Sequence, residues 1–187
     1  MNIFATDPDP VKSAKALDDK RVNKMILESA QMLCTALHLN NASHLAKYRK
    51  THANHPSNIW TRETRSNYEW LLAHYHALLE EYYDRSGGKR HASGLLYNDL
   101  KSGAVFIPAG PLTPIANCAA RQDMNINFKH LTDTYLAYKL YLLTRWTHDK
   151  REPTWHGVKL LNSRNHNSAP EWIRSFLRLY VTLHLLA

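Results

Sequence analysis

The sequence predicts a single domain that is all-α or nearly so. A chain of 187 residues suits one domain and is long enough to bury a core. Apolar residues recur every three and four positions along several stretches, as they do on the buried face of a helix. No alternation of strand-like and helix-like segments, internal repeat or low-complexity tract interrupts this pattern. We therefore expect one compact helical domain over residues 1–187, with long loops.

The first expected helix follows the turn residues Asp7-Pro8-Asp9-Pro10. Asp9 suits the N-cap, and Pro10 suits the first helical position, where a backbone N–H has no helical partner. Helical periodicity then runs from Val11 to Leu39, and we expect a break near Asp18-Asp19. One buried face of this stretch is marked by Val22, Met25, Ile26, Ser29, Leu33, Ala36 and Leu37.

Two further long helices are expected in the middle of the chain. The first runs from Ser57 to Asp84 and is ended by Ser86-Gly87-Gly88. The second runs from Phe128 to Trp146. Gly, Pro and Asn are frequent between them, so Gly87 to Asn127 is expected to form long loops with short helical turns.

The C-terminal segment predicts an additional helix over residues 168–187. Its start is marked by Ser168, which suits the N-cap, and by Glu171 three residues later. This spacing is that of a capping box, in which the two side chains satisfy each other's free backbone N–H groups.

The charge of the chain favours a polyanionic partner. Twenty-four Lys and Arg oppose sixteen Asp and Glu, which gives a net charge of +8 and a pI of about 9.5. Neutralised phosphates release counterions, so such a balance favours nucleic acid. No run of five or more Lys or Arg marks a disordered arm, so the charge is spread over folded elements. A basic protein without a nucleic-acid partner is the alternative.

Several functional classes are excluded by what the sequence lacks. No apolar run is long enough to span a bilayer, and no secretory signal precedes the domain. Cys34 and Cys118 are far apart, so we expect two buried free thiols in a reducing compartment. Phosphate-binding loops, dinucleotide fingerprints, nucleophile elbows and HExxH motifs are missing. His52 and His55 offer at most two converging ligands, so we expect no metal site.

A polar stripe lies opposite the apolar face of the first long helix. It consists of Arg21, Lys24, Glu28 and Gln31, spaced by three, four and three residues. In one interpretation Lys24 and Glu28 form an exposed i,i+4 ion pair worth a few tenths of a kcal/mol. In the other, Glu28 is an acid or base among cations that hold phosphates. The pattern alone leaves both open.

Trp155 differs from the other aromatic residues. Most of the Trp and Tyr residues recur at the spacing of a helical core. Trp155 instead lies in a basic loop, Lys150-Arg151-Glu152-Pro153-Thr154-Trp155-His156-Gly157. An aromatic ring among cations is typical of a surface on which a nucleic-acid base stacks.

Three stretches of the sequence carry a family resemblance. They are Leu17 through Glu28, His55-Pro56 followed by Tyr68 through Gly87, and Arg151 through Trp155. In these stretches the chain resembles the pyrimidine-dimer glycosylases of T-even phages and their bacterial relatives. Together the three stretches spread over residues 1–160. The resemblance implies a small helical enzyme that flips a nucleotide out of duplex DNA. It also implies the cytoplasm of a bacterial or phage-infected cell.

The resemblance assigns the chemistry to two residues. The family's catalytic glutamate lies nine residues after an early Asp, and counting from Asp19 places it at Glu28. The family attacks the sugar C1′ with an N-terminal α-amine, and the resulting Schiff base releases the base and permits strand cleavage. Here that amine belongs to Met1, because Asn2 is bulky enough that Met1 is expected to be retained.

The sequence thus predicts a DNA glycosylase-like enzyme acting on a damaged or modified pyrimidine, with possible AP-lyase activity. A DNA base-modifying transferase and a non-catalytic DNA-binding protein remain alternatives. No cofactor, metal or membrane partner is expected, and a monomer is the expected state. The expected contacts with DNA are Asn2, Arg21, Lys24, Gln31, His55, Arg62, Arg65, Trp155 and Lys159.

Overall fold

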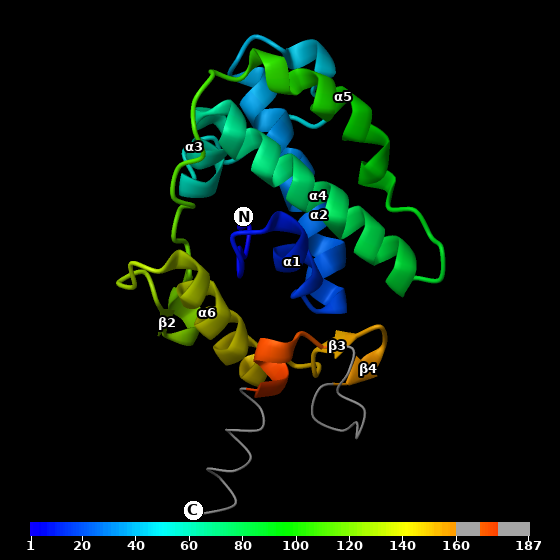
Figure 1. The fold of residues 1–187 in the computed structure, drawn as a ribbon, viewed down its shortest axis with the longest axis vertical. Helices are drawn as coiled ribbons and strands as arrows, with labels where there is room; N and C mark the ends of the chain where they lie inside the picture. Colours follow the sequence, from blue (N-terminus) through cyan, green and yellow to red (C-terminus); the bar gives the residue numbers. More distant parts are fainter. Residues whose placement is uncertain (160–168, 176–187) are drawn as a thin grey trace, which may run out of the picture.

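Helices make up most of the fold, which confirms the expected fold class (Figure 1). The computed structural model describes residues 1–159 and 169–175. The α-helices are α1 (Pro10–Lys15), α2 (Asp19–His38), α3 (Pro56–Glu63), α4 (Arg65–Arg85), α5 (Tyr97–Gly103) and α6 (Thr134–His148). Residues 171–175 are also helical. Short 3-10 helices cover Ser43–Leu45, Ala92–Leu96, Ala104–Phe106 and Gln122–Met124.

The strands of the described residues pair as two short antiparallel hairpins. In one, β1 (Ala120–Arg121) pairs with β2 (Ile126–Asn127), and Ala120 faces Asn127. In the other, β3 (Thr154–Trp155) pairs with β4 (Val158–Lys159), and Trp155 faces Val158. The first hairpin contacts α6 through β2, and the second contacts α2 through β3.

The expected break near Asp18-Asp19 separates α1 from α2. The Asp9 carboxylate accepts the N–H groups of Val11 and Lys12 at 2.8 and 3.2 Å and begins α1. The helix ends at Lys15, and Asp18 has extended backbone angles immediately before α2. The turn between α1 and α2 directs α1 onto α4, and the two helices pack against each other.

The expected helix from Ser57 to Asp84 is two helices, so that boundary prediction was wrong. Thr64 has extended angles (φ −138°, ψ 155°) between α3 and α4. Its hydroxyl accepts the N–H of Asn67 at 3.2 Å and donates to the carbonyl of Pro111 at 2.9 Å. A threonine at an N-cap replaces the helical hydrogen bonds it interrupts. Apolar periodicity continues across the break and therefore conceals it.

The last two expected helices differ from the structure in extent. α6 begins at Thr134 rather than near Phe128, because the Asp133 carboxylate accepts the N–H of Leu136 at 3.0 Å. The expected terminal helix is observed over residues 171–175. Ser168 and residues 176–187 lie outside the described residues.

The core lies where α2 crosses α4, with α1 and the N-terminal segment beside them (Figure 1). Figure 1 shows the N-terminus between this group and α6. Both Cys34 and Cys118 are buried free thiols, as expected. Within the described residues, no helix is long and apolar enough to cross a membrane.

His74 makes the stability of this core depend on pH. Burial lowers its pKa from 6.5 to about 4, although the hydrogen bond with the carbonyl of Pro10 acts to raise it. A neutral folded histidine binds fewer protons than the unfolded one below pH 6.5. The contribution of His74 to the free energy of unfolding is therefore fully present above pH 6.5 and is lost as the pH falls toward 4.

We expect the free energy of unfolding to fall by about 3 kcal/mol between pH 7 and pH 4 on account of His74. His74→Phe keeps a ring against Trp70, on which His74 stacks, but cannot be protonated. Chemical denaturation across this pH range measures both proteins. The variant should be less stable at pH 7, since the bond to Pro10 is lost, and should show a flatter pH dependence. Equal pH slopes would contradict the assignment.

Candidate active site

The segment that follows the first two residues is buried in the interior of the protein. Ile3, Ala5 and Thr6 are almost completely buried, and Phe4 is nearly so. The Phe4 ring stacks on Tyr141 and meets Tyr138 edge-on. Its backbone is left-handed (φ 57°), a conformation that a bulky side chain adopts only where its surroundings impose it. The core thus fixes the direction in which the first residues run.

Asn2 closes a turn at the start of this segment. Its Oδ1 accepts the N–H groups of Ile3 and Phe4 at 2.8 and 3.4 Å. Its Nδ2 donates to the carbonyl of Cys118 at 3.3 Å. Both polar atoms of the side chain are therefore occupied within the protein. Asn2 holds the terminus in place, which differs from the expected contact with DNA.

Glu28 lies beside the N-terminus on the middle of α2. Its Oε2 accepts the N–H of Asn2 at 3.0 Å and lies 3.9 Å from the α-amine of Met1. Its Oε1 lies 3.1 Å from Nζ of Lys24. The i,i+4 ion pair and the carboxylate beside an amine are thus both present. The two sequence interpretations of the stripe do not exclude each other.

Burial distinguishes the members of this cluster. The side chain of Glu28 is 14% exposed, whereas that of Lys24 is 64% exposed. The carboxylate is thus partly removed from water, and its interactions with cations are stronger there than in bulk water. Gln31, the next residue of the stripe, is half-buried on α2.

His55 caps α3 within electrostatic range of the amine. Its Nδ1 accepts the N–H of Ser57 at 3.2 Å, which requires the neutral ring to carry its proton on Nε2. Burial lowers the pKa of His55, as do the positive charges of the N-terminal amine, His52 and Lys129, while Glu28 acts to raise it. The ring is therefore neutral at pH 7.

Lys129 and Asn58 belong to the surroundings of this site but were not expected from the sequence. Lys129 is exposed in the loop after β2, and Asn58 contacts the Met1 side chain from α3. Neither lies in a motif or on a helical stripe with Glu28. The run Lys129-His130 is basic, which is a weak signal shared by many loops.

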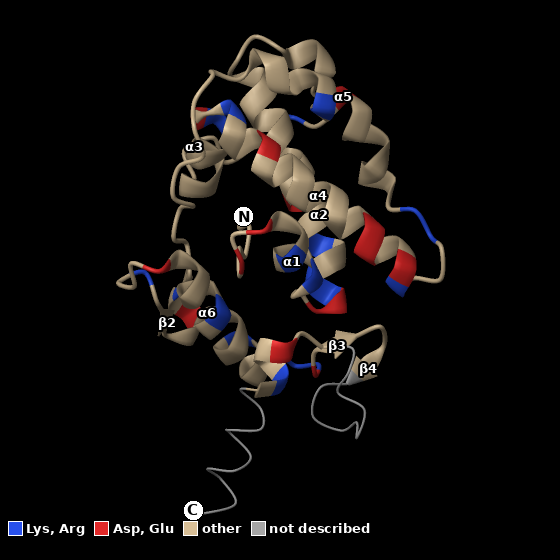
Figure 2. Ribbon diagram, viewed as in Figure 1, with Lys and Arg blue, Asp and Glu red and all other residues tan. Residues whose placement is uncertain are grey.

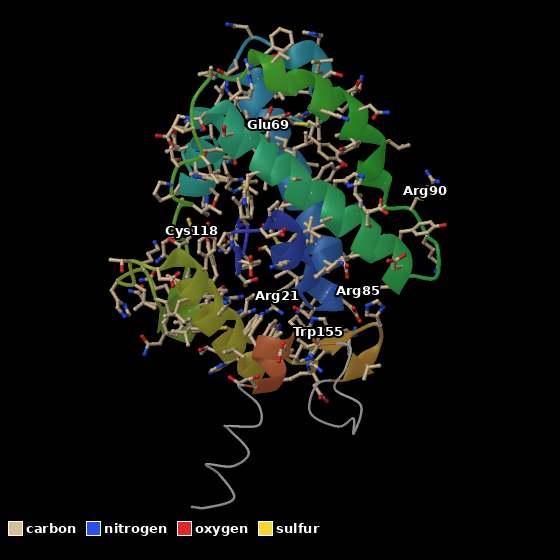
Figure 3. All side chains as sticks on the ribbon, in the orientation of Figure 1. Arg21, Glu69, Arg85, Arg90, Cys118 and Trp155 are labelled. Carbon is tan, nitrogen blue, oxygen red and sulfur yellow. The ribbon has the colours of Figure 1, made fainter. Side chains whose placement is uncertain are left out.

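Arg21 does not lie on the surface, which corrects the expectation of a phosphate contact. Its guanidinium is nearly buried, 2.8 Å from Asp18 and 2.8 Å from Asp149. Burial acts to lower the pKa of Arg21, but the charges and hydrogen bonds of the two carboxylates outweigh it and raise this pKa. Figure 3 shows Arg21 at the end of the molecule that also holds Trp155, away from Cys118. Its role is to join α2 to the end of α6.

Trp155 is also a structural residue, which corrects the expectation of a stacking surface. The ring is 0% exposed and meets Trp146 edge-on at 5.2 Å. Asp19 holds the hairpin in place, because its carboxylate accepts Thr154 Oγ1 at 2.6 Å and the N–H of Gly157 at 2.9 Å. A base has no access to this ring.

The remaining expected contacts are dispersed. Arg62 donates to the carbonyl of Ala53, and Arg65 donates to the carbonyl of Val105 at 3.0 Å. Both arginines are half-buried and tie loops to α3 and α4. Lys159 lies in β4, and its side chain is outside the described part of the structure. Figure 2 shows basic residues spread over several elements, α2 and the loop after α4 among them, with acidic ones between them.

The chemistry available at the site is that of an amine beside a carboxylate. A neutral amine is a nucleophile, and a partly buried carboxylate can take and return its proton. Over residues 1–159 and 169–175, no three His, Cys, Asp or Glu side chains converge as metal ligands would.

One comparison with known proteins gives a match, and it covers the N-terminal part of the chain. A family model described as pyrimidine dimer DNA glycosylase matches residues 1–93. The matched segment contains Met1, Glu28 and His55, whereas Arg151 through Trp155 lies beyond it. The expected resemblance is confirmed over this range. No curated protein and no solved structure matches the chain significantly.

We expect Arg21 and Lys24 to differ in what they contribute. Arg21→Met breaks a buried ion pair and should cost about 3–5 kcal/mol in the free energy of unfolding. Lys24→Met should leave stability nearly unchanged and lower the slope of log K for DNA against log salt by about 0.9. Chemical denaturation and salt titration of duplex binding measure the two effects. A stable Arg21→Met protein with a reduced salt slope would restore Arg21 as a phosphate contact.

Proposed function

We propose that this chain, whose residues 1–93 belong to the pyrimidine dimer DNA glycosylase family, releases a damaged or modified pyrimidine through the α-amine of Met1 with Glu28 as acid and base. The family match supports an enzyme of the DNA glycosylase class with DNA as its substrate. One observation carries the finer proposal. The α-amine lies 3.9 Å from a carboxylate that is itself fixed by the N–H of Asn2.

A nucleotide must leave the helical stack to reach this amine. The chain is buried from Ile3 to Thr6, and the Met1 side chain is only 3% exposed, so the amine is tethered close to the protein and cannot extend toward a duplex. Extrusion of the target nucleotide brings C1′ to the amine instead. Exposed Lys24 and Lys129 lie around the site and suit the phosphates on either side.

In the proposed reaction the neutral amine nitrogen gives its lone pair to C1′ of the target sugar. The bond from C1′ to the pyrimidine nitrogen breaks, and its electron pair leaves with the base, which takes up one of the two protons that the amine loses on becoming an imine. Glu28 accepts a proton from the new C1′–N group and returns it to O4′ as the sugar ring opens. The product is an imine between C1′ and Met1, and no other reactant is consumed.

The same imine accounts for a lyase step. It withdraws electrons from C2′, so that a base can remove a C2′ proton. The C3′–O3′ bond then breaks, and the 3′ phosphate departs with the electron pair. Glu28 is the proposed base, since its carboxylate already lies beside the imine nitrogen.

We expect Glu28→Gln to lower single-turnover base release by about 10²–10⁴-fold, the usual contribution of an acid or base. The amide can still accept the Asn2 N–H, so the free energy of unfolding should change by less than about 1 kcal/mol. Quenched-flow assays on duplexes with modified pyrimidines and chemical denaturation measure the two quantities.

Glu69→Gln is the matched control, because Glu69 is exposed on α4 away from the N-terminus (Figure 3). It removes the same charge and should leave base release unchanged. An active Glu28→Gln protein would return Glu28 to the role of a surface ion pair.

We expect an N-terminally extended chain to fold and bind DNA but to lose turnover. An added residue converts the amine into an amide, which has no nucleophilic lone pair. Borohydride reduction during turnover should trap a covalent adduct with the native chain and none with the extended one. Mass spectrometry of the adduct should place DNA on the N-terminal peptide.

A C-terminal extension is the control and should leave both activities intact. An N-terminally extended chain as active as the native one would refute the amine mechanism and favour base-modifying transfer through side chains.

A further inference from the structure

The side chain of Met1 is packed as a core residue although it is the first of the chain. It is 3% exposed. Its Sδ lies 3.0 Å from Nδ2 of Asn58 in the first turn of α3. A thioether is a weak hydrogen-bond acceptor, and its polarizable chain adapts to irregular gaps. The terminus is therefore held on two sides, by Glu28 at the backbone and by Asn58 at the side chain.

Asn58 makes contacts that fix the orientation of its amide. It is 1% exposed. Besides Met1, its Nδ2 contacts the carbonyls of Thr51 at 3.1 Å and His52 at 2.8 Å. A flipped amide would point its oxygen at three acceptors, so only the observed orientation can be satisfied.

Stability alone does not explain an asparagine at this position. Its Oδ1 is buried and has no hydrogen-bond partner among the described residues, which is costly. The two carbonyls have other donors, because Thr51 accepts from Thr35 Oγ1 and His52 accepts from the N–H of His55. The contact that depends on Asn58 alone is the one with Met1.

We propose that Asn58 is a positioning residue that acts through the Met1 side chain to set where the α-amine lies. The inference rests on the proposed function, because it concerns the same nucleophile. In this proposal the side chain of Met1 helps to position the amine, so an α-amine on a residue with a shorter side chain does not react at the native rate. Near-attack geometry tolerates displacements of only about 1 Å before rates fall about 100-fold.

The first test varies the anchor and keeps an α-amine. Fusion to a ubiquitin-like leader and cleavage at its end yields chains that begin with Met1, Met1→Leu or Met1→Gly. Asn58→Leu removes the amide in a chain with the native terminus. We expect Met1→Gly and Asn58→Leu to lower the single-turnover rate of imine trapping about 100-fold while the Kd for duplex stays within about threefold. Met1→Leu, which retains the packing, should recover most of the rate.

Asn67→Leu is the matched control. Asn67 is equally buried, and its Nδ2 donates to the carbonyl of Trp60 at 2.9 Å and to Thr113 Oγ1 at 2.8 Å, with no contact to the terminus. It should lower the melting temperature but leave the trapping rate of the folded protein unchanged. Equal losses of rate in Asn58→Leu and Asn67→Leu, or a fully active Met1→Gly chain, would overturn the proposal.

The second test does not depend on catalysis. Reductive methylation of the α-amine is followed by mass spectrometry of the N-terminal peptide. The native amine should react at least tenfold more slowly than that of an unstructured peptide, and Met1→Gly and Asn58→Leu should remove this protection. An unprotected native amine would refute the anchor. Protection without any imine trapping would refute the amine mechanism and leave the anchor supported.

Discussion

The candidate site depends on the burial of the N-terminal segment. A chain terminus is ordinarily exposed and poorly ordered unless it is tied down. Here residues 3–6 are part of the core, and the left-handed Phe4 turns the chain toward α2. The N–H of Asn2 and the α-amine of Met1 consequently meet one carboxylate, that of Glu28. Without this burial the amine would sample many positions, and its distance from Glu28 would have no meaning for chemistry.

A second constraint lies at the start of α2, where two adjacent carboxylates hold the later part of the chain. Asp18 accepts hydrogen bonds from Arg21 and from the indole of Trp146. Asp19 accepts a hydrogen bond from the hydroxyl of Thr154 in the β3–β4 hairpin and lies 3.2 Å from Arg85 at the end of α4. These groups use charge to join distant segments. Some of the 24 Lys and Arg residues are therefore paired inside the protein, and composition overstates the number of cations that can meet a phosphate.

Sequence reasoning named Glu28 and Met1, which the structure places 3.9 Å apart, but not the residues around them. Glu28 was expected from the polar stripe and from the family resemblance, and Met1 from the resemblance alone. Asn58 carries no such signal, because its three contacts come from the loop before α3 and from Met1 itself. Arg21 and Trp155 were placed on the DNA surface because cations and an aromatic ring in a polar stretch are typical of one. Their burial depends on Asp149 and Trp146, which the local sequence does not reveal.

Local signals by themselves determined the helical class, the break before α2, the N-cap of α1 and the position of Glu28 on a helix face. These features depend on residues within one or two turns, where backbone propensity and capping act. Only the tertiary structure decided which polar residues are buried, where Thr64 divides a continuous apolar face, and what the first residue touches. The partners in those contacts are remote, as with Arg21 and Asp149, which lie 128 residues apart. Whether a charge meets water or another charge depends on how the helices pack, and one-dimensional periodicity does not encode that.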